Sequence, residues 1–306
     1  MASSKPTFCD VPLADAASLT KADVAVFGAP HGSLYQPGTA SHAVDAPDTL
    51  RSALAWYSHN PQSYDFDAMT NVFGGADVVD CGDAPGGLDD NAANRAAIAD
   101  MARGILDADT VPILIGGDDS TPIPFIGAYG RRGPLTILQI DAHIDWRDEV
   151  DGEHFGFSST MRRASEMDHV KSIVQIGARG PGSARPQEVT EARDWGATII
   201  PARQLHQQPI AEVIESVPRG PDIYLAIDVD GIDPAVVPGV LLPAFGGVTY
   251  TQMLELIFGI AERGRIVGAN FVEYVPDKDP TGTGAQAIAR LICNVIAAIG
   301  KQRHGP

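Results

Sequence analysis

The chain is short of basic residues. Its 306 residues include 22 lysines and arginines against 39 aspartates and glutamates, which gives a formal net charge of −17. Binding to duplex nucleic acid depends on Lys and Arg side chains that neutralise phosphates, and anionic membrane surfaces attract basic segments. We therefore expect neither nucleic acid nor a membrane among the partners. The acidic balance suits a small cationic substrate, although a solubilising acidic surface explains much of the excess.

Cysteine and long apolar runs are scarce as well. Cys9, Cys81 and Cys293 lie far apart and form no Cys-X-X-Cys motif, which is typical of reduced thiols in a cytosolic protein. The first twelve residues contain one lysine and no apolar core, unlike a signal peptide. Apolar runs fall well short of the ~20 residues that span a bilayer. These features predict a cytoplasmic protein.

Strand-like apolar segments alternate with segments that carry apolar residues at helical spacing. Residues 91–107 and 249–263 show the helical spacing most clearly. About eight strands and about seven helices in alternation predict an α/β fold whose mostly parallel sheet is covered on both faces. The sequence contains neither an internal repeat nor a dividing linker, so we expect one domain over residues 1–306.

Three of the predicted strands are followed by clustered acids. The motifs are Gly-Gly-Asp-Asp-Ser at 116–120, Asp-Ala-His-Ile-Asp at 141–145 and Asp-Val-Asp-Gly-Ile-Asp-Pro at 228–234. The carboxyl ends of parallel strands meet at one edge of a sheet, and alternate residues of an extended chain point to the same side. At least five carboxylates and one imidazole should therefore gather there. Such like charges repel unless cations lie among them, so the motifs predict a metal site and favour two ions.

These motifs, in this order and followed by a Gly-X-X-X-X-Glu that ends at Glu273, resemble the signature of the ureohydrolases, the arginase and agmatinase superfamily. The resemblance covers nearly the whole chain. It implies a three-layer α/β/α sandwich with a mostly parallel, about eight-stranded sheet. It also implies hydrolysis of a guanidinium group to urea and an amine at a dinuclear manganese centre, and assembly as a homotrimer or homohexamer.

The resemblance further implies a set of metal ligands. Asp141 and Asp228 would bridge the two ions, and His143 and Asp230 would complete one of the two sites. The remaining expected ligands are Asp119 and Asp145. Oxygen and imidazole ligands suit Mn²⁺, although Ni²⁺ or Co²⁺ would bind such a set more tightly.

Catalytic roles follow from the same resemblance. Two ions can share a water and lower its pKa, and the resulting hydroxide would attack the guanidinium carbon. Asp145 would hold that hydroxide and then shuttle its proton. Glu273 would grip the guanidinium through paired hydrogen bonds.

One departure from the family pattern concerns the metal site. Asp119 stands where relatives usually have a histidine ligand. An aspartate is shorter, but its oxygens can still ligate Mn²⁺. Three outcomes are open: a dinuclear site with Asp119 as a ligand, one tight and one weak ion, or a largely metal-free chain.

A second departure concerns the catalytic loop. Phe157 stands where relatives carry a catalytic histidine, and a phenyl ring cannot transfer a proton. His154 could take over this role, unless it is an exposed loop residue. Phe157 could instead form an apolar or cation-stacking wall for a substituted guanidinium. Four arginines are candidates for a substrate carboxylate, and two histidines could face the mouth of the site: Arg162, Arg163, Arg179, Arg185, His31 and His42.

Together these features predict a metal-dependent hydrolase of a small guanidino compound that releases urea. Hydrolysis of another linear amidine, such as a formimino group, is the enzymatic alternative. A weakly active or silent subunit that partners an active homologue is the other alternative, and Asp119 and Phe157 are the residues that favour it. The intact acid cluster speaks against it, because buried carboxylates without cations are unfavourable. The sequence leaves open which substrate and metal are used, and which group protonates the leaving amine.

Overall fold

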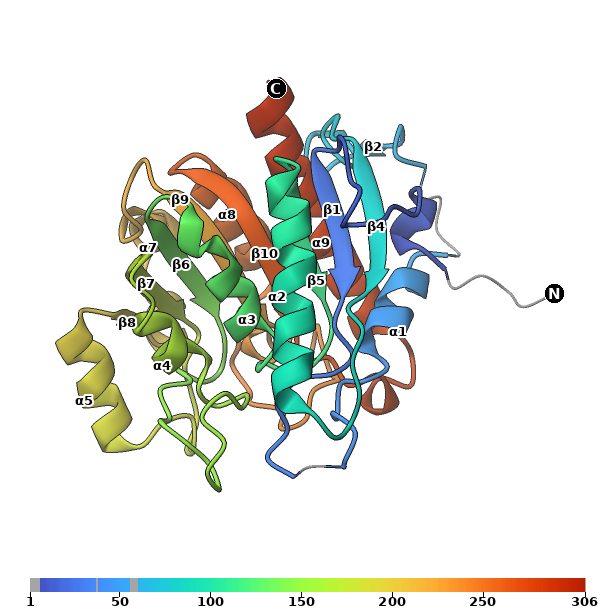
Figure 1. The fold of residues 1–306 in the computed structure, drawn as a ribbon. Coiled ribbons are helices and arrows are strands. Elements are labelled where there is room, and N and C mark those ends of the chain that lie inside the picture. Colours follow the sequence, from blue (N-terminus) through green and yellow to red (C-terminus); the bar gives the residue numbers. More distant parts are fainter. Residues whose placement is uncertain (1–5, 37, 56–59, 306) are drawn as a thin grey trace.

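The centre of the molecule is an eight-stranded sheet, described here from a computed structural model that covers residues 6–36, 38–55 and 60–305 (Figure 1). Its order is β4-β1-β5-β10-β9-β6-β7-β8, and all neighbouring strands pair in parallel. The strands are β1 (Val24–Gly28), β4 (Val78–Asp83), β5 (Val111–Ile115), β6 (Leu135–Ile140), β7 (Val170–Ile176), β8 (Thr198–Ile200), β9 (Asp222–Asp228) and β10 (Arg265–Val272).

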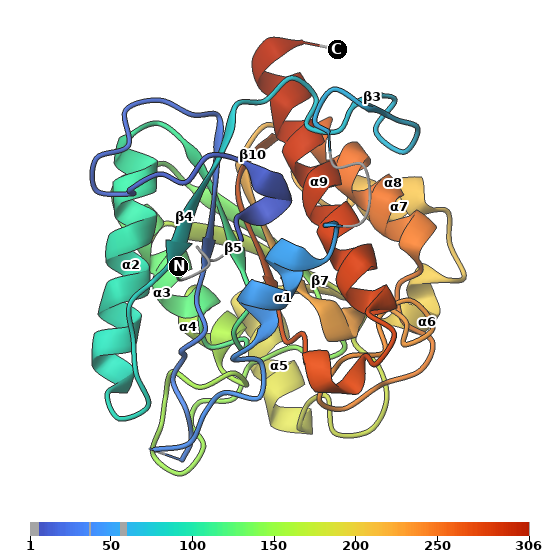
Figure 2. The same ribbon diagram turned by 90° about the vertical axis from the view of Figure 1, so that its right-hand side faces the viewer.

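Helices cover both faces of this sheet, as Figure 2 shows from the side. One layer contains α2 (Asn91–Asp107), α3 (Pro122–Gly127), α4 (Thr160–Ser165) and α5 (Pro186–Trp195). The other contains α1 (Ala46–Ser52), α7 (Ile210–Glu215), α8 (Tyr250–Ala261) and α9 (Thr283–His304), with the short α6 (Ala202–Leu205) after β8. The predicted three-layer α/β/α fold with a parallel sheet is confirmed.

The strands supply side chains to two cores, one on each face. In β1, Val24 and Val26 join the core beneath α1, α8 and α9, whereas Ala25 and Phe27 join the core beneath α2 and α3. All five residues of β1 are buried. This pattern explains the uninterrupted apolar runs in the sequence, because a parallel strand covered on both faces has no solvent side.

Helix α9 corrects the expectation about apolar segments. In the described part of the chain it is long and apolar enough to span a membrane by length and composition alone, and 78% of its most apolar window is buried. Its buried residues belong to the core shared with α8 and the sheet. Packing inside the protein thus accounts for the apolar composition of α9.

Some elements differ from the sequence expectation. The helix expected over residues 249–263 runs from Tyr250 to Ala261 as α8. Helix α1 begins at Ala46, so His42 lies in the loop before it. The hairpin of β2 (Tyr64–Asp65) and β3 (Thr70–Asn71) was not expected, because two-residue strands are too short to show an alternating pattern. Short 3₁₀ helices cap other loops: η1 (Phe8–Asp10), η2 (Ala128–Arg131), η3 (Val229–Gly231) and η4 (Pro276–Lys278).

Candidate active site

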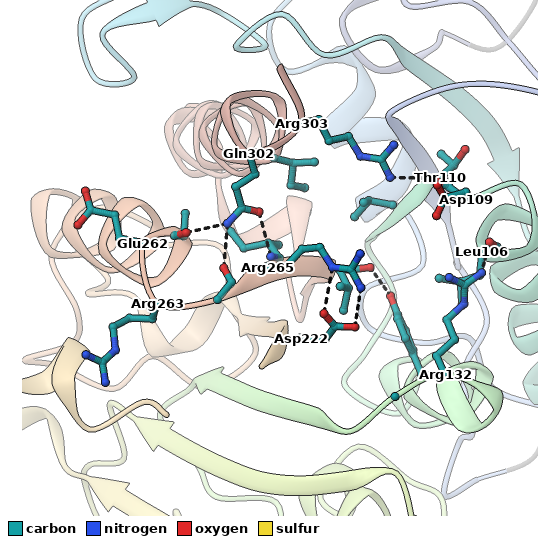
Figure 3. Close-up of a pocket in the computed structure, with 18 residues that line it drawn as sticks. Leu106, Asp109, Thr110, Arg132, Asp222, Glu262, Arg263, Arg265, Gln302 and Arg303 are labelled. Atoms are coloured by element: carbon teal, nitrogen blue, oxygen red, sulfur yellow. Dashed lines mark hydrogen bonds and ion pairs between the residues drawn. The ribbon is translucent and has the colours of Figure 1, made fainter. Parts of the chain in front are cut away.

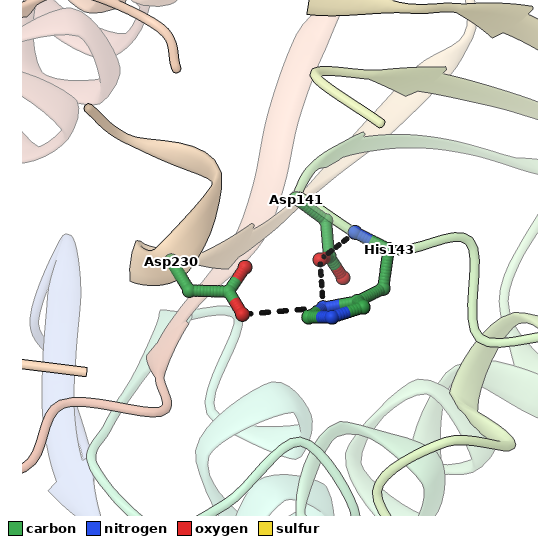
Figure 4. A group of neighbouring side chains, drawn as sticks. All are labelled: Asp141, His143 and Asp230. Atoms are coloured by element: carbon green, nitrogen blue, oxygen red, sulfur yellow. Dashed lines mark hydrogen bonds and ion pairs between the residues drawn. The ribbon is translucent and has the colours of Figure 1, made fainter. Parts of the chain in front are cut away.

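The loop after β6 begins the acid cluster. Asp141 follows the last residue of β6, and its Oδ1 accepts a hydrogen bond from the backbone N of His143 at 2.6 Å. The Nδ1 atom of His143 lies 3.3 Å from Asp141 Oδ1 and 3.1 Å from Asp230 Oδ2. Figure 4 shows the imidazole edge facing both carboxylates. These three residues have ligand atoms within 4.8 Å of one another, which is a spacing that one metal ion can bridge.

The loop after β9 brings the second pair of acids to the same place. Asp228 ends β9 and accepts a hydrogen bond from the backbone N of Asp230, and Asp230 accepts one from Ala142 N at 3.0 Å. The two loops touch at Gly231, where a Cβ atom would lie 2.5 Å from Asp141 N. Only glycine permits this approach, so Gly231 sets the distance between the two acid loops.

The loop after β5 supplies Asp119. Its carboxylate forms a second group with Asp141 and Asp228, again with ligand atoms within 4.8 Å of one another. Asp118 instead accepts hydrogen bonds from Ser41 Oγ and Ser120 N and holds the loop. The two possible ion sites thus share the carboxylate of Asp141.

The chemistry of this cluster fits divalent cations. Oδ2 of Asp119 is buried and has no hydrogen-bond partner among the described residues. Burial, together with the neighbouring charge of Asp141, raises the pKa of Asp119 and of Asp145 well above the usual range, and burial next to Asp230 does the same for Asp228. Ionised carboxylates are therefore unfavourable here unless a cation compensates them.

His143 and Asp145 have different hydrogen-bond partners within the acid cluster. Burial opposes protonation of His143, but hydrogen bonds to Asp141 and Asp230 outweigh it and raise the imidazole pKa to about 11. Asp145 belongs to neither three-residue group. Its Oδ2 accepts a hydrogen bond at 2.7 Å from Gln139, whose amide also donates to Asp141 at 2.6 Å. Gln139 was not singled out from the sequence, because nothing distinguishes it from any polar residue in a strand.

Glu273 lies beside the cluster, directly after β10. Its φ of 68° turns the chain at this point, and its Oε1 accepts a hydrogen bond from Asp119 N at 2.8 Å. Its Oε2 lies 2.5 Å from Nε2 of His42. The structure therefore places His42 at the site, where the sequence left it as one of two candidates near the mouth.

The aromatic residues nearby form a wall rather than a proton relay. The ring of Phe157 lies 4.6 Å from that of Tyr35 and 5.5 Å, edge to face, from that of His42. His154 is half-exposed, and its Nδ1 lies 3.1 Å from the carbonyl oxygen of Asp148. The structure thus does not bring His154 to the acid cluster.

A cavity of about 250 Å³ opens over the cluster. Acids and His143 line one part of it, and Phe157, Leu241 and Leu242 provide an apolar part. Its full lining is His143, Asp145, Trp146, Arg147, Phe157, Ser158, Gly182, Ser183, Glu188, Asp228, Asp230, Leu241, Leu242 and Glu273.

The four arginines considered as candidates for a substrate carboxylate have other contacts. Arg162 pairs with Glu166 and Glu191, and Arg163 pairs with Asp148. Arg179 donates to backbone carbonyls, including those of Asp230 and Ala244, and Arg185 is largely exposed. Among the described residues, the arginine that lines the cavity is Arg147.

A larger cavity, of about 700 Å³, lies at the opposite edge of the sheet, where β5, β9 and β10 begin. Figure 3 shows its arginines bonded to the protein itself: Arg265 to Asp222, and Arg303 to the carbonyl of Asp109. Arg132 likewise donates to the carbonyl of Leu106. These arginines thus pair with the protein itself. The acid cluster is therefore the better candidate for the active site.

Comparison with known proteins assigns the fold and the site to a family. The arginase family model matches residues 22–298. The chain belongs to the arginase family. This membership confirms the superfamily predicted from the motifs.

Two relatives from Pseudomonas aeruginosa illustrate the similarity. A guanidinobutyrase is 34% identical over 200 residues, which span 62% of each chain. A guanidinopropionase is 31% identical over 303 residues, which span 94% of this chain and 91% of the relative. The alignment with the chicken mitochondrial agmatinase covers 66% of that protein. The chain thus matches less than two thirds of the length of the guanidinobutyrase and the agmatinase.

Solved structures show the same fold. Proclavaminate amidino hydrolase from Streptomyces clavuligerus superimposes with a TM-score of 0.85 at 24% identity, and the match covers 98% of both chains. Formimidoylglutamase from Bacillus subtilis superimposes with a TM-score of 0.82 at 21% identity over 96% of this chain and 92% of the other.

Proposed function

We propose that this chain hydrolyses a guanidino compound to urea and an amine. The observation that carries the proposal is the pair of ligand groups that share Asp141 and open, beside Glu273, into one cavity. The relatives named guanidinobutyrase and guanidinopropionase support the guanidino class. The negative lining of the cavity floor suits a cationic head group.

The acid cluster would hold two divalent cations, Mn²⁺ in the first instance. Asp141, His143 and Asp230 form one set of ligands, and Asp119, Asp141 and Asp228 form the other. Cations held there would compensate the carboxylate charges and would supply an activated water for the hydrolysis. Aspartate in place of the usual histidine keeps the donor set in the class that Mn²⁺ accepts, and the unpartnered Oδ2 of Asp119 gives it a free ligand atom.

The remaining groups bind and orient the substrate. Glu273 lines the cavity, and its carboxylate would accept hydrogen bonds from the guanidinium, a charge-assisted contact. Asp145 lines the same cavity and, held by Gln139, is placed to move a proton towards the leaving amine. Phe157 and Leu241 would exclude water from the apolar side. His154 has no part in this arrangement.

The test is elemental analysis of purified protein loaded with Mn²⁺, followed by a product assay with guanidino compounds. We expect about two ions per chain and urea in the same amount as the amine. Formamide and an amine released from an N-formimino compound, with no urea from the guanidino compounds, would assign the chain to formimino-type amidines. Failure to retain metal and to release either product would overturn the proposal and favour the silent-subunit alternative.

A further inference from the structure

The cavity over the acid cluster is lined by a basic side chain that does not belong to the cluster. Among the described residues, Arg147 and His143 are the basic side chains that line it. His143 is bonded to Asp141 and Asp230, so its charge is compensated within the cluster. Arg147 also contacts an acid, Glu188, but through its Nε atom alone.

Contacts around Arg147 fix its position. Its backbone N donates to the carbonyl of Ser158 at 3.0 Å, and its Nε donates to Glu188 Oε1 at 3.2 Å. The other oxygen of Glu188 accepts a hydrogen bond from Arg185 N at 2.7 Å. Glu188 is thus engaged on both oxygens, whereas neither terminal nitrogen of Arg147 has a hydrogen-bond partner among the described residues. Two parallel N–H donors are left for a ligand.

We propose that Arg147 binds the carboxylate of the substrate, so that the substrate is an ω-guanidino acid rather than a guanidino amine. The proposal rests on the proposed function and names the substrate class of the same site. The acid cluster takes the cationic head, Phe157 and Leu241 contact the aliphatic middle, and the guanidinium fork of Arg147 takes the anionic tail. Bidentate pairing with a carboxylate is the contact that this fork favours. An ammonium tail would be repelled by Arg147 and would find Glu188 already bonded.

The experiment compares three compounds that differ only in the tail: guanidinobutanoate, guanidinobutanamide and guanidinobutylamine. We expect the acid to have a kcat/KM about 10- to 100-fold above that of the amide, which is the range for one charge-assisted pair. The amine should rank last. Equal values for the three compounds, or preference for the amine, would overturn the proposal.

Variants test whether the preference for the carboxylate tail depends on Arg147. Arg147→Gln keeps a donor for Glu188 but loses the charge, so it should lower kcat/KM for the acid by about 10- to 100-fold and lower that for the amide much less. Arg162→Gln is the matched control, because Arg162 also pairs with glutamates but does not line the cavity. An equal loss for acid and amide would contradict a role in tail recognition. If Arg147→Gln does not fold, the ranking of the three compounds by the unaltered protein still tests the proposal.

Binding of products separates this proposal from the proposed function. Titration calorimetry with aminobutanoate and butanediamine measures tail recognition without turnover. If no compound is hydrolysed, the proposed function fails, while tighter binding of aminobutanoate, lost in Arg147→Gln, still supports the carboxylate site. If urea is released but butanediamine binds more tightly, the proposed function stands and Arg147 is not a carboxylate site.

Discussion

At the scale of single residues, His42 is the least expected member of the site. Its Nε2 lies 2.5 Å from Oε2 of Glu273, and its ring packs edge to face against Phe157. Glu273 is buried, and its two oxygens accept from Asp119 N and face His42. Under the proposed function, His42 would therefore be a positioning residue that acts on the substrate through the carboxylate of Glu273.

This position predicts the effect of substitution. His42→Ala should raise KM for the guanidino substrate about 10-fold, the effect of one charge-assisted hydrogen bond, with a smaller change in kcat. His42→Gln, which retains a donor, should recover part of the loss. His154→Ala is the control and should leave both parameters unchanged, because His154 lies outside the cavity. A fall in kcat alone after His42→Ala would indicate proton transfer instead of positioning.

At the scale of elements, α9 shows how closely a helix can meet a loop. A Cβ atom at Gly300 would lie 2.5 Å from the carbonyl oxygen of Phe73 and 2.6 Å from that of Gly74. Both contacts are with backbone, which cannot rotate away. The glycine is thus required by the contact with the loop before β4, in spite of its poor helix propensity.

Gly300→Ala should therefore destabilise the protein, although alanine favours a helix by ~1 kcal/mol. Overpacking against backbone typically costs about 1–3 kcal/mol, and we expect a net loss near the middle of that range. Urea unfolding measures this loss of stability. Gly259→Ala in α8 is the matched control, because its new methyl would meet only the flexible end of Ile214. Equal urea midpoints for the two variants would show that the loop before β4 shifts to accommodate the new methyl group.

The elements also show what the sequence can predict. The bounds of α2 match the expected segment, residues 91–107, because this helix has a complete hydrophobic pattern. The gathering of the acids was predictable from three local motifs, since parallel strands end at one edge of the sheet. His42 and Arg147 were not assigned, because their roles depend on loop paths that bring residues distant in sequence to Glu273 and Glu188.

At the scale of the whole molecule, a net charge of −17 coexists with a buried acid cluster. Exposed charges are screened within about 8 Å at physiological ionic strength, but the buried carboxylates are not. Three of these carboxylates lie close enough to repel one another where the strands end: those of Asp119, Asp141 and Asp228. The folded state should therefore gain more stability from bound divalent ions than from salt.

Chelation should lower the thermal unfolding midpoint of Mn²⁺-loaded protein, because ions that bind only the folded state stabilise it by ~2.7 kcal/mol at 100 times their Kd. NaCl should not restore the midpoint. Asp119→Asn should raise the midpoint of chelated protein, since it removes a buried like charge, and should reduce the gain from Mn²⁺, since it removes a ligand. The two effects have opposite signs and distinguish a metal ligand from a packing residue. A variant that lowers both midpoints equally would show that Asp119 serves only the fold.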